Sequence, residues 1–125
     1  MNKAFVNNKY FSSSEFDSPD SVGSGEKMNV EFIEKLTIAR RLSNIPYIIN
    51  SGYRTISQNR KIGGVSNSSH CKGLAVDIAC STSQDRYKIL QGLIKAGFKR
   101  IGISRTFIHV DYDKDKVQLV SWLYN

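Results

Sequence analysis

The side chains of this sequence that are best suited to chemistry are two histidines, the only ones it contains. His70 lies in Ser-Ser-His-Cys-Lys-Gly-Leu-Ala-Val-Asp, so that Asp77 follows seven positions later, and His109 lies in Phe-Ile-His-Val-Asp. Two imidazoles and one carboxylate form the ligand set of many catalytic zinc ions, which keep a fourth position open for water. The sequence therefore predicts a zinc site made by His70, Asp77 and His109. The alternatives are a buried salt bridge or helix cap for Asp77 and a hydrogen-bonded core position for His109.

Two further side chains are candidates for catalysis. Side chains two positions apart on an extended strand share a face, so Asp111 is expected to point the same way as His109. There it is placed either to hold the ligand set or to take a proton from the metal's water. Arg54 follows Ser-Gly-Tyr at a junction between strand and loop. A guanidinium at that point is suited to binding a substrate carboxylate or stabilising the oxyanion of a scissile carbonyl.

The composition limits the class of protein. A chain of 125 residues is expected to form one domain, spanning 1–125, without disulfide support. No apolar stretch approaches the roughly 20 residues that span a bilayer, and the first residues lack a signal-peptide core, so no export route is visible. Cys71 and Cys80 match no zinc-finger spacing and are expected to be reduced thiols, with a disulfide or a ligand role as alternatives.

The net charge of +7 predicts an anionic partner. The basic clusters are only pairs, such as Arg40-Arg41, and no nucleic-acid motif accompanies them. An anionic cell wall fits this charge at least as well as DNA does.

The elements that must position these residues follow from periodicity and caps. Asn29 is expected to cap a helix that ends before Pro46, and Thr82 to cap a second one that ends at Gly97. The expected strands are 47–51, 74–79, 100–103, 107–112 and 117–123, the last two as a possible hairpin, with a short helix at 57–61. Residues 1–27 are rich in turns but carry aromatic residues, so they are expected to pack irregularly on the core.

Four segments of the sequence resemble a known family: Ser51-Gly52-Tyr53-Arg54, the stretch from Gly63 to His70, Gly73-Leu74-Ala75-Val76-Asp77 and Phe107-Ile108-His109-Val110-Asp111. Together they resemble the zinc D-alanyl-D-alanine carboxypeptidases, and more narrowly the compact peptidase domains of bacteria and phage lysis cassettes. The resemblance implies an α+β fold, shared with the hedgehog signalling domain, with helices packed on a small antiparallel sheet that carries the metal. It makes His70, Asp77 and His109 the zinc ligands and Arg54 the arginine that polarises the substrate.

The chain departs from that family at one position. Many relatives carry a catalytic acid three residues before the last histidine, where this chain has Thr106. Asp111 is our substitute for that acid, chosen from strand geometry, and it would carry a proton to the leaving amine.

The expected function is zinc-dependent hydrolysis of the peptide stems of peptidoglycan by a protein that acts as a monomer, without a nucleic-acid or membrane partner. Removal of a terminal D-Ala and internal cleavage of the stem are both open. A wall-binding module that kept the zinc but lost turnover is the alternative function, and a basic nucleic-acid-binding protein is a more distant one.

Overall fold

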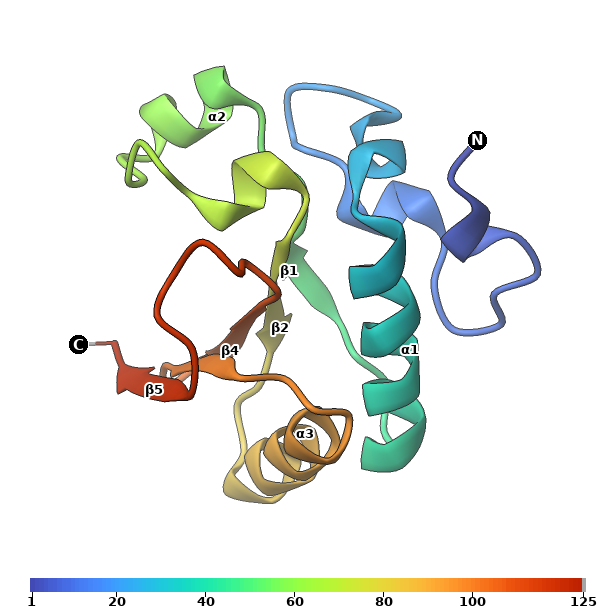
Figure 1. Cartoon of the computed structure of the whole chain (residues 1–125), viewed down its shortest axis with the longest axis vertical. Coiled ribbons are helices and arrows are strands. Elements are labelled where there is room, and N and C mark those ends of the chain that lie inside the picture. Colours follow the sequence, from blue (N-terminus) through green and yellow to red (C-terminus); the bar gives the residue numbers. More distant parts are fainter. Residues whose placement is uncertain (125) are drawn as a thin grey trace.

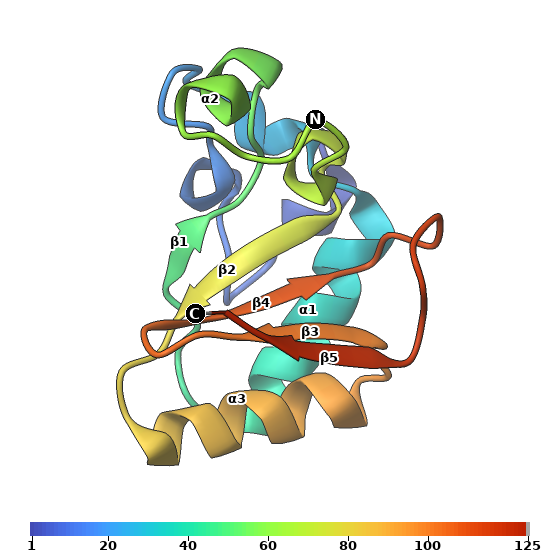
Figure 2. The same ribbon diagram turned by 90° about the vertical axis from the view of Figure 1, so that its left-hand side faces the viewer.

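A five-stranded sheet forms the centre of the computed structural model, which describes residues 1–124. Its strands are β1 (Ile49–Ser51), β2 (Ala75–Ala79), β3 (Arg100–Ile103), β4 (Phe107–Asp111) and β5 (Val120–Leu123), in the spatial order β1-β2-β4-β3-β5. Figure 2 shows the sheet with α1 behind it and α3 along its lower edge. The predicted α+β fold class is confirmed.

The two longer α-helices begin where the predicted caps place them, and the short one begins one residue earlier than expected. The α-helices are α1 (Val30–Ser43), α2 (Ile56–Lys61) and α3 (Ser83–Lys95). Asn29 accepts a hydrogen bond from the backbone N–H of Phe32 at the start of α1, and Thr82 accepts one from Asp85 at the start of α3. Gly97 follows α3 with a φ of 93°, a left-handed conformation that favours glycine.

Alternation along the central strands separates a core face from a functional face. Val76 and Ile78 of β2, and Ile108 and Val110 of β4, have no exposed surface and belong to the same hydrophobic cluster as the buried residues of α1. Each such side chain contributes about 1.5–3 kcal/mol through burial. The residues between them therefore point to the opposite face, which α1 does not cover (Figure 2).

The register of the strands brings polar residues together on that opposite face. Asp77 of β2 lies opposite His109 of β4, which in turn lies opposite Gly102 of β3. Trp122 of β5 lies opposite Gly102. These four positions form a row across the sheet, so the fold itself carries residues from β2, β4 and β5 to one place.

The last strand differs from the prediction. We expected 107–112 and 117–123 to form a hairpin in an antiparallel sheet, but β5 pairs with β3 and runs parallel to it, so the sheet is mixed. The reason is that β2 and β3 already occupy both edges of β4. The chain reverses direction after β4, as in a hairpin, but it must cross to the free edge of β3 to find a partner.

The bounds and the burial of some predicted elements also differ from the structure. The strand expected at 47–51 is shorter, Ile49–Ser51, and lies at the edge of the sheet, where the neighbouring Ile48 is 61% exposed. The apolar faces of the helices do not include every large side chain, since Leu42 of α1 and Tyr87 and Ile94 of α3 are exposed.

The N-terminal segment packs on the core as expected. It forms three short 3-10 helices, Lys3–Phe5, Ser13–Phe16 and Ser24–Lys27, which lie beside the upper part of α1 in Figure 1. Phe11 and Phe16 are buried, and their rings meet edge to face at 5.3 Å between centroids. The aromatic residues of this segment thus contribute to the central hydrophobic cluster.

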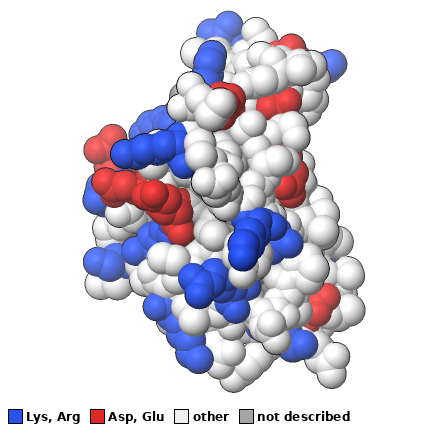
Figure 3. Space-filling model, turned by 90° about the vertical axis from the view of Figure 1, so that its right-hand side faces the viewer, with Lys and Arg blue, Asp and Glu red and all other residues white. Residues whose placement is uncertain are grey.

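The outer surface is mixed in charge. Figure 3 shows separate groups of Lys and Arg side chains, with Asp and Glu between them, on the side that carries α1 and the N-terminal segment. No helix within residues 1–124 has both the length and the apolar composition needed to cross a membrane.

Candidate metal centre

His70 is held at its backbone N–H and at one nitrogen of its ring. It lies in the 3-10 helix Ser69–Lys72, where Ser68 accepts a hydrogen bond from its backbone N–H. Its ring Nδ1–H donates to the carbonyl of Gly52 at 2.8 Å, and the residue is only 4% exposed. The hydrogen bond on Nδ1 leaves Nε2 as the nitrogen with a free lone pair, and it fixes the direction in which that lone pair points.

His109 is fixed in the same way by a carboxylate. Its Nε2–H donates to Asp111 Oδ2 at 2.8 Å, while Arg100 Nε–H donates to Asp111 Oδ1 at 2.8 Å. The Asp111 side chain is 1% exposed, so both of its oxygens are engaged away from water. This arrangement leaves Nδ1 of His109 free to bind a metal.

The free nitrogens of the two histidines converge on Asp77. Asp77 Oδ1 lies 3.4 Å from His70 Nε2 and 3.0 Å from His109 Nδ1, and the three ligand atoms all lie within 4.8 Å of one another. Ligands of one metal ion at about 2 Å are separated by about 3–4 Å, so this set fits a metal after a small closure. The structure brings together the three residues that the sequence singled out, and their role as ligands stays a prediction.

Burial and pairing set the charge states of the centre without a metal. Burial by itself would raise the pKa of Asp77, but hydrogen bonds from His109 and His70 hold that pKa well below its usual range. Burial would lower the pKa of His109, but its bonds to Asp111 and Asp77 raise it. The pKa of Asp111 is lowered by His109 and Arg100 despite its burial. In the metal-free protein both carboxylates are thus ionised beside a His109 ring that favours its protonated form, and a metal ion on Nδ1 would displace the proton there.

Arg54 lies at the mouth of the centre and is held by two neighbours. Its guanidinium donates to Asn59 Oδ1 at 3.0 Å and to Ser51 Oγ at 3.1 Å. A Cβ on Gly64 would collide with Asn59 Oδ1, so a glycine is required for this close approach. Gly64 thus helps to place Arg54, whose remaining N–H groups can bind a ligand.

The three residues of the centre line a cleft of about 320 Å³. Arg54, which follows β1, and the segment around Ser68 line it together with Trp122 and Tyr124, which come from β5 and the residue after it at the opposite edge of the sheet. The ring of Trp122 lies 5.5 Å from the ring of His109, and that of Tyr124 lies 6.4 Å from it. The sequence did not predict that these two rings line the cleft, because we expected strand 117–123 to pair with strand 107–112. The spacing of Trp122 and Tyr124, two positions apart, was the one indication that both side chains point to the same face of the sheet.

Asp113 is a third residue whose role the sequence did not reveal. Its side chain is 1% exposed rather than solvated, accepts from Ser69 Oγ at 2.7 Å and pairs with Lys72 Nζ at 3.0 Å. These bonds hold the pKa of Asp113 below its usual range, although burial would raise it. Asp113 therefore ties the loop after β4 to the 3-10 helix that carries His70.

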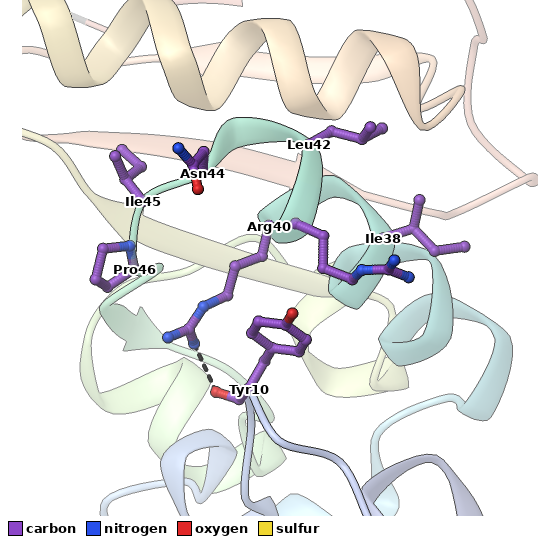
Figure 4. Close-up of a pocket in the computed structure, with 8 residues that line it drawn as sticks. Tyr10, Ile38, Arg40, Leu42, Asn44, Ile45 and Pro46 are labelled. Atoms are coloured by element: carbon purple, nitrogen blue, oxygen red, sulfur yellow. Dashed lines mark hydrogen bonds between the residues drawn. The ribbon is translucent and has the colours of Figure 1, made fainter.

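Other candidate sites lack this chemistry. A larger hollow of about 520 Å³ lies outside the C-terminal half of α1, where Arg40 donates to the carbonyl of Tyr10 at 2.6 Å (Figure 4). Its lining includes no acid, histidine or cysteine among the described residues. Cys71 and Cys80 are free thiols and neither lines the cleft. Thr106 is exposed in the turn between β3 and β4.

Comparison with known proteins agrees with this geometry. A sequence model of a family described as Peptidase M15 matches residues 8–111. That segment contains His70, Asp77, His109 and Arg54, and it ends before β5. No curated protein gives a significant match to the chain.

Proposed function

The chain belongs to the Peptidase M15 family, and from this premise we propose that it is a zinc-dependent peptidase that hydrolyses the peptide stems of peptidoglycan. The observation that carries the proposal is the convergence of His70 Nε2, Asp77 Oδ1 and His109 Nδ1 inside a cleft, with each histidine fixed through its other nitrogen. Two histidines and one carboxylate that leave a coordination position open are a donor set of catalytic rather than structural zinc sites.

When bound, zinc supplies Lewis acidity that polarises a carbonyl group and acidifies a water molecule. The chain's own residues orient the reactants. Arg54, fixed by Asn59 and Ser51, directs its unused N–H groups into the cleft, where they can bind the substrate and stabilise the charge that develops on the carbonyl oxygen. The cleft shelters this charge from bulk water, which strengthens each hydrogen bond.

Asp111 has the geometry of a positioning residue. Both of its oxygens are occupied, by His109 and by Arg100, and neither faces the open side of the cleft. Of its two expected roles, holding the ligand set therefore has more support than carrying a proton to the leaving amine. In this role the carboxylate keeps the His109 proton on Nε2, which leaves Nδ1 available as a ligand.

The charge of the cleft supports an acidic peptide as substrate. Arg54 and Lys116 both line it, and the protein as a whole carries a net charge of +7. The stem peptides of peptidoglycan are short, carry carboxylates and belong to an anionic wall, so they match this surface. Removal of a terminal D-Ala and cleavage within the stem are both compatible with an open cleft.

The test is digestion of purified muropeptides with the zinc-loaded protein, followed by mass spectrometry of the products. We expect loss of a defined fragment, no cleavage by the chelated protein, and no cleavage or zinc binding by His70→Ala. Cys71→Ala is a matched control, since this neighbouring side chain does not line the cleft. Equal cleavage by metal-free protein would overturn the proposal.

One observation favours a second candidate, a zinc-containing module that binds the wall without cleaving it. Thr106 replaces the acid found in many relatives, and it does not line the cleft. This candidate predicts that the zinc form binds muropeptides and leaves every bond intact, so the same digestion decides between the two.

A further inference from the structure

The aromatic side of the cleft lies outside the segment that the family match covers. That match ends at residue 111, whereas Trp122 and Tyr124 come from β5 and the residue after it. The backbone N–H of Tyr124 donates to the carbonyl of Ile103 at 2.9 Å, which continues the β3–β5 pairing. The backbone of Tyr124 is therefore held in place by the sheet.

Glycine in β3 lets these two rings approach the metal centre. A Cβ on Gly102 would lie 2.6 Å from Nε1 of Trp122 and 2.6 Å from a ring carbon of Tyr124. Since Gly102 also lies opposite His109 in the sheet, the absence of a side chain there opens the space beside His109. The phenol of Tyr124 fills that space, and its ring also packs on Phe107 at 5.2 Å between centroids.

Among the polar groups of the cleft, the hydroxyl of Tyr124 is a hydrogen-bond donor that is not already used in a bond to another residue described by the structure. Arg100 is bound to Asp111, and Ser69 is bound to Asp113. Within residues 1–124, no group accepts a hydrogen bond from the Tyr124 hydroxyl. A phenol keeps its proton at neutral pH, so this hydroxyl is available as a donor.

We propose that Tyr124 is a catalytic residue of the proposed peptidase, whose hydroxyl donates a hydrogen bond to the substrate oxygen that becomes negatively charged in the transition state. This inference rests on the proposed function. Arg54 and Tyr124 then face the scissile bond from opposite sides of the cleft, one cationic and one neutral. No proton leaves Tyr124, because a hydrogen bond alone stabilises the charge.

The experiment compares Tyr124→Phe with the wild type and with Tyr87→Phe, a matched control on the exposed side of α3. Muropeptide cleavage gives kcat and KM. The fluorescence of Trp122, the only tryptophan of the chain, reports zinc and muropeptide binding without catalysis. We expect Tyr124→Phe to lower kcat by about 10²–10³-fold, the usual effect of losing one such donor. Its KM and its zinc titration should match the wild type, and Tyr87→Phe should retain full activity.

The outcomes separate this inference from the proposed function. If the wild type cleaves muropeptides and Tyr124→Phe cleaves them equally fast, Tyr124 is not catalytic and the peptidase proposal stands. If Tyr124→Phe loses zinc or peptide affinity in the fluorescence titration, its role is structural and the inference is wrong. A wild-type protein that binds zinc but cleaves no bond overturns both, because Tyr124 then has no reaction to serve.

Discussion

Replacing Asp111 with Asn separates the two roles that this carboxylate can have. In the wild type, Oδ2 accepts from His109 and Oδ1 accepts from Arg100, each at 2.8 Å. An asparagine of the same shape has one accepting oxygen and one NH₂ group, so either His109 or Arg100 then faces another donor. The hydrogen bond that fixes the His109 ring is weakened, or the Arg100 guanidinium loses its buried partner.

The magnitudes follow from these contacts. Loss of the carboxylate behind a ligating histidine lowers metal affinity by about 10–100-fold, so we expect Asp111→Asn to bind zinc that much more weakly. Arg100 is only 13% exposed, and leaving a buried donor without its acceptor costs about 1–3 kcal/mol. The free energy of unfolding of the metal-free variant should fall by that amount in urea denaturation.

The assay is competition for zinc against a chelator of known affinity, with kcat measured at saturating zinc. Asp115→Asn is the matched control, because its carboxylate lies in the loop that follows Asp111 and is 87% exposed. An unchanged zinc affinity in Asp111→Asn would refute the positioning role. If affinity is unchanged while kcat falls, Asp111 acts in proton transfer, as the strand geometry first allowed.

Three further predictions concern pH, the arginine and the core. In the metal-free protein the raised pKa of His109 adds stability below about pH 6.5, and this stability is lost as pH rises through the folded-state pKa. Zinc binds only the neutral ring, so the increase in Tm caused by zinc should grow between about pH 6 and 9. An increase in Tm that is constant over this range would contradict the prediction. Gly64→Ala should displace Asn59 and with it Arg54, so we expect muropeptide kcat/KM to fall while the zinc titration stays at the wild-type value. Gly92→Ala should place a methyl group against Ser43 where α3 meets α1, and calorimetry or urea denaturation should show a loss of about 1–3 kcal/mol without a change in zinc affinity.

The sequence predicted the parts of the site that depend on local pattern. The caps at Asn29 and Thr82 are local hydrogen bonds between residues three apart, and both helices begin there. Asp77 and His109 stand out because each is a polar residue inside an apolar strand, and the antiparallel register of β2 and β4 brings them together.

The sequence could not predict the features that depend on which strand is free to pair. The position of β5 is decided by the open edge of β3, a property of the assembled sheet, so the aromatic side of the cleft was missed. The burial of Asp113 likewise depends on Lys72 and Ser69, more than 40 positions away along the chain. Such contacts leave no periodic signal in a single sequence.

The central claim is that His70, Asp77 and His109 hold a zinc ion that serves peptide hydrolysis. The most direct measurement is mass spectrometry of muropeptides during incubation with metal-free protein, before and after addition of one equivalent of zinc. The account predicts no cleavage before the addition, cleavage of one defined bond after it, and none at either stage with His70→Ala. Cleavage that begins without zinc, or that persists in His70→Ala, would contradict the account.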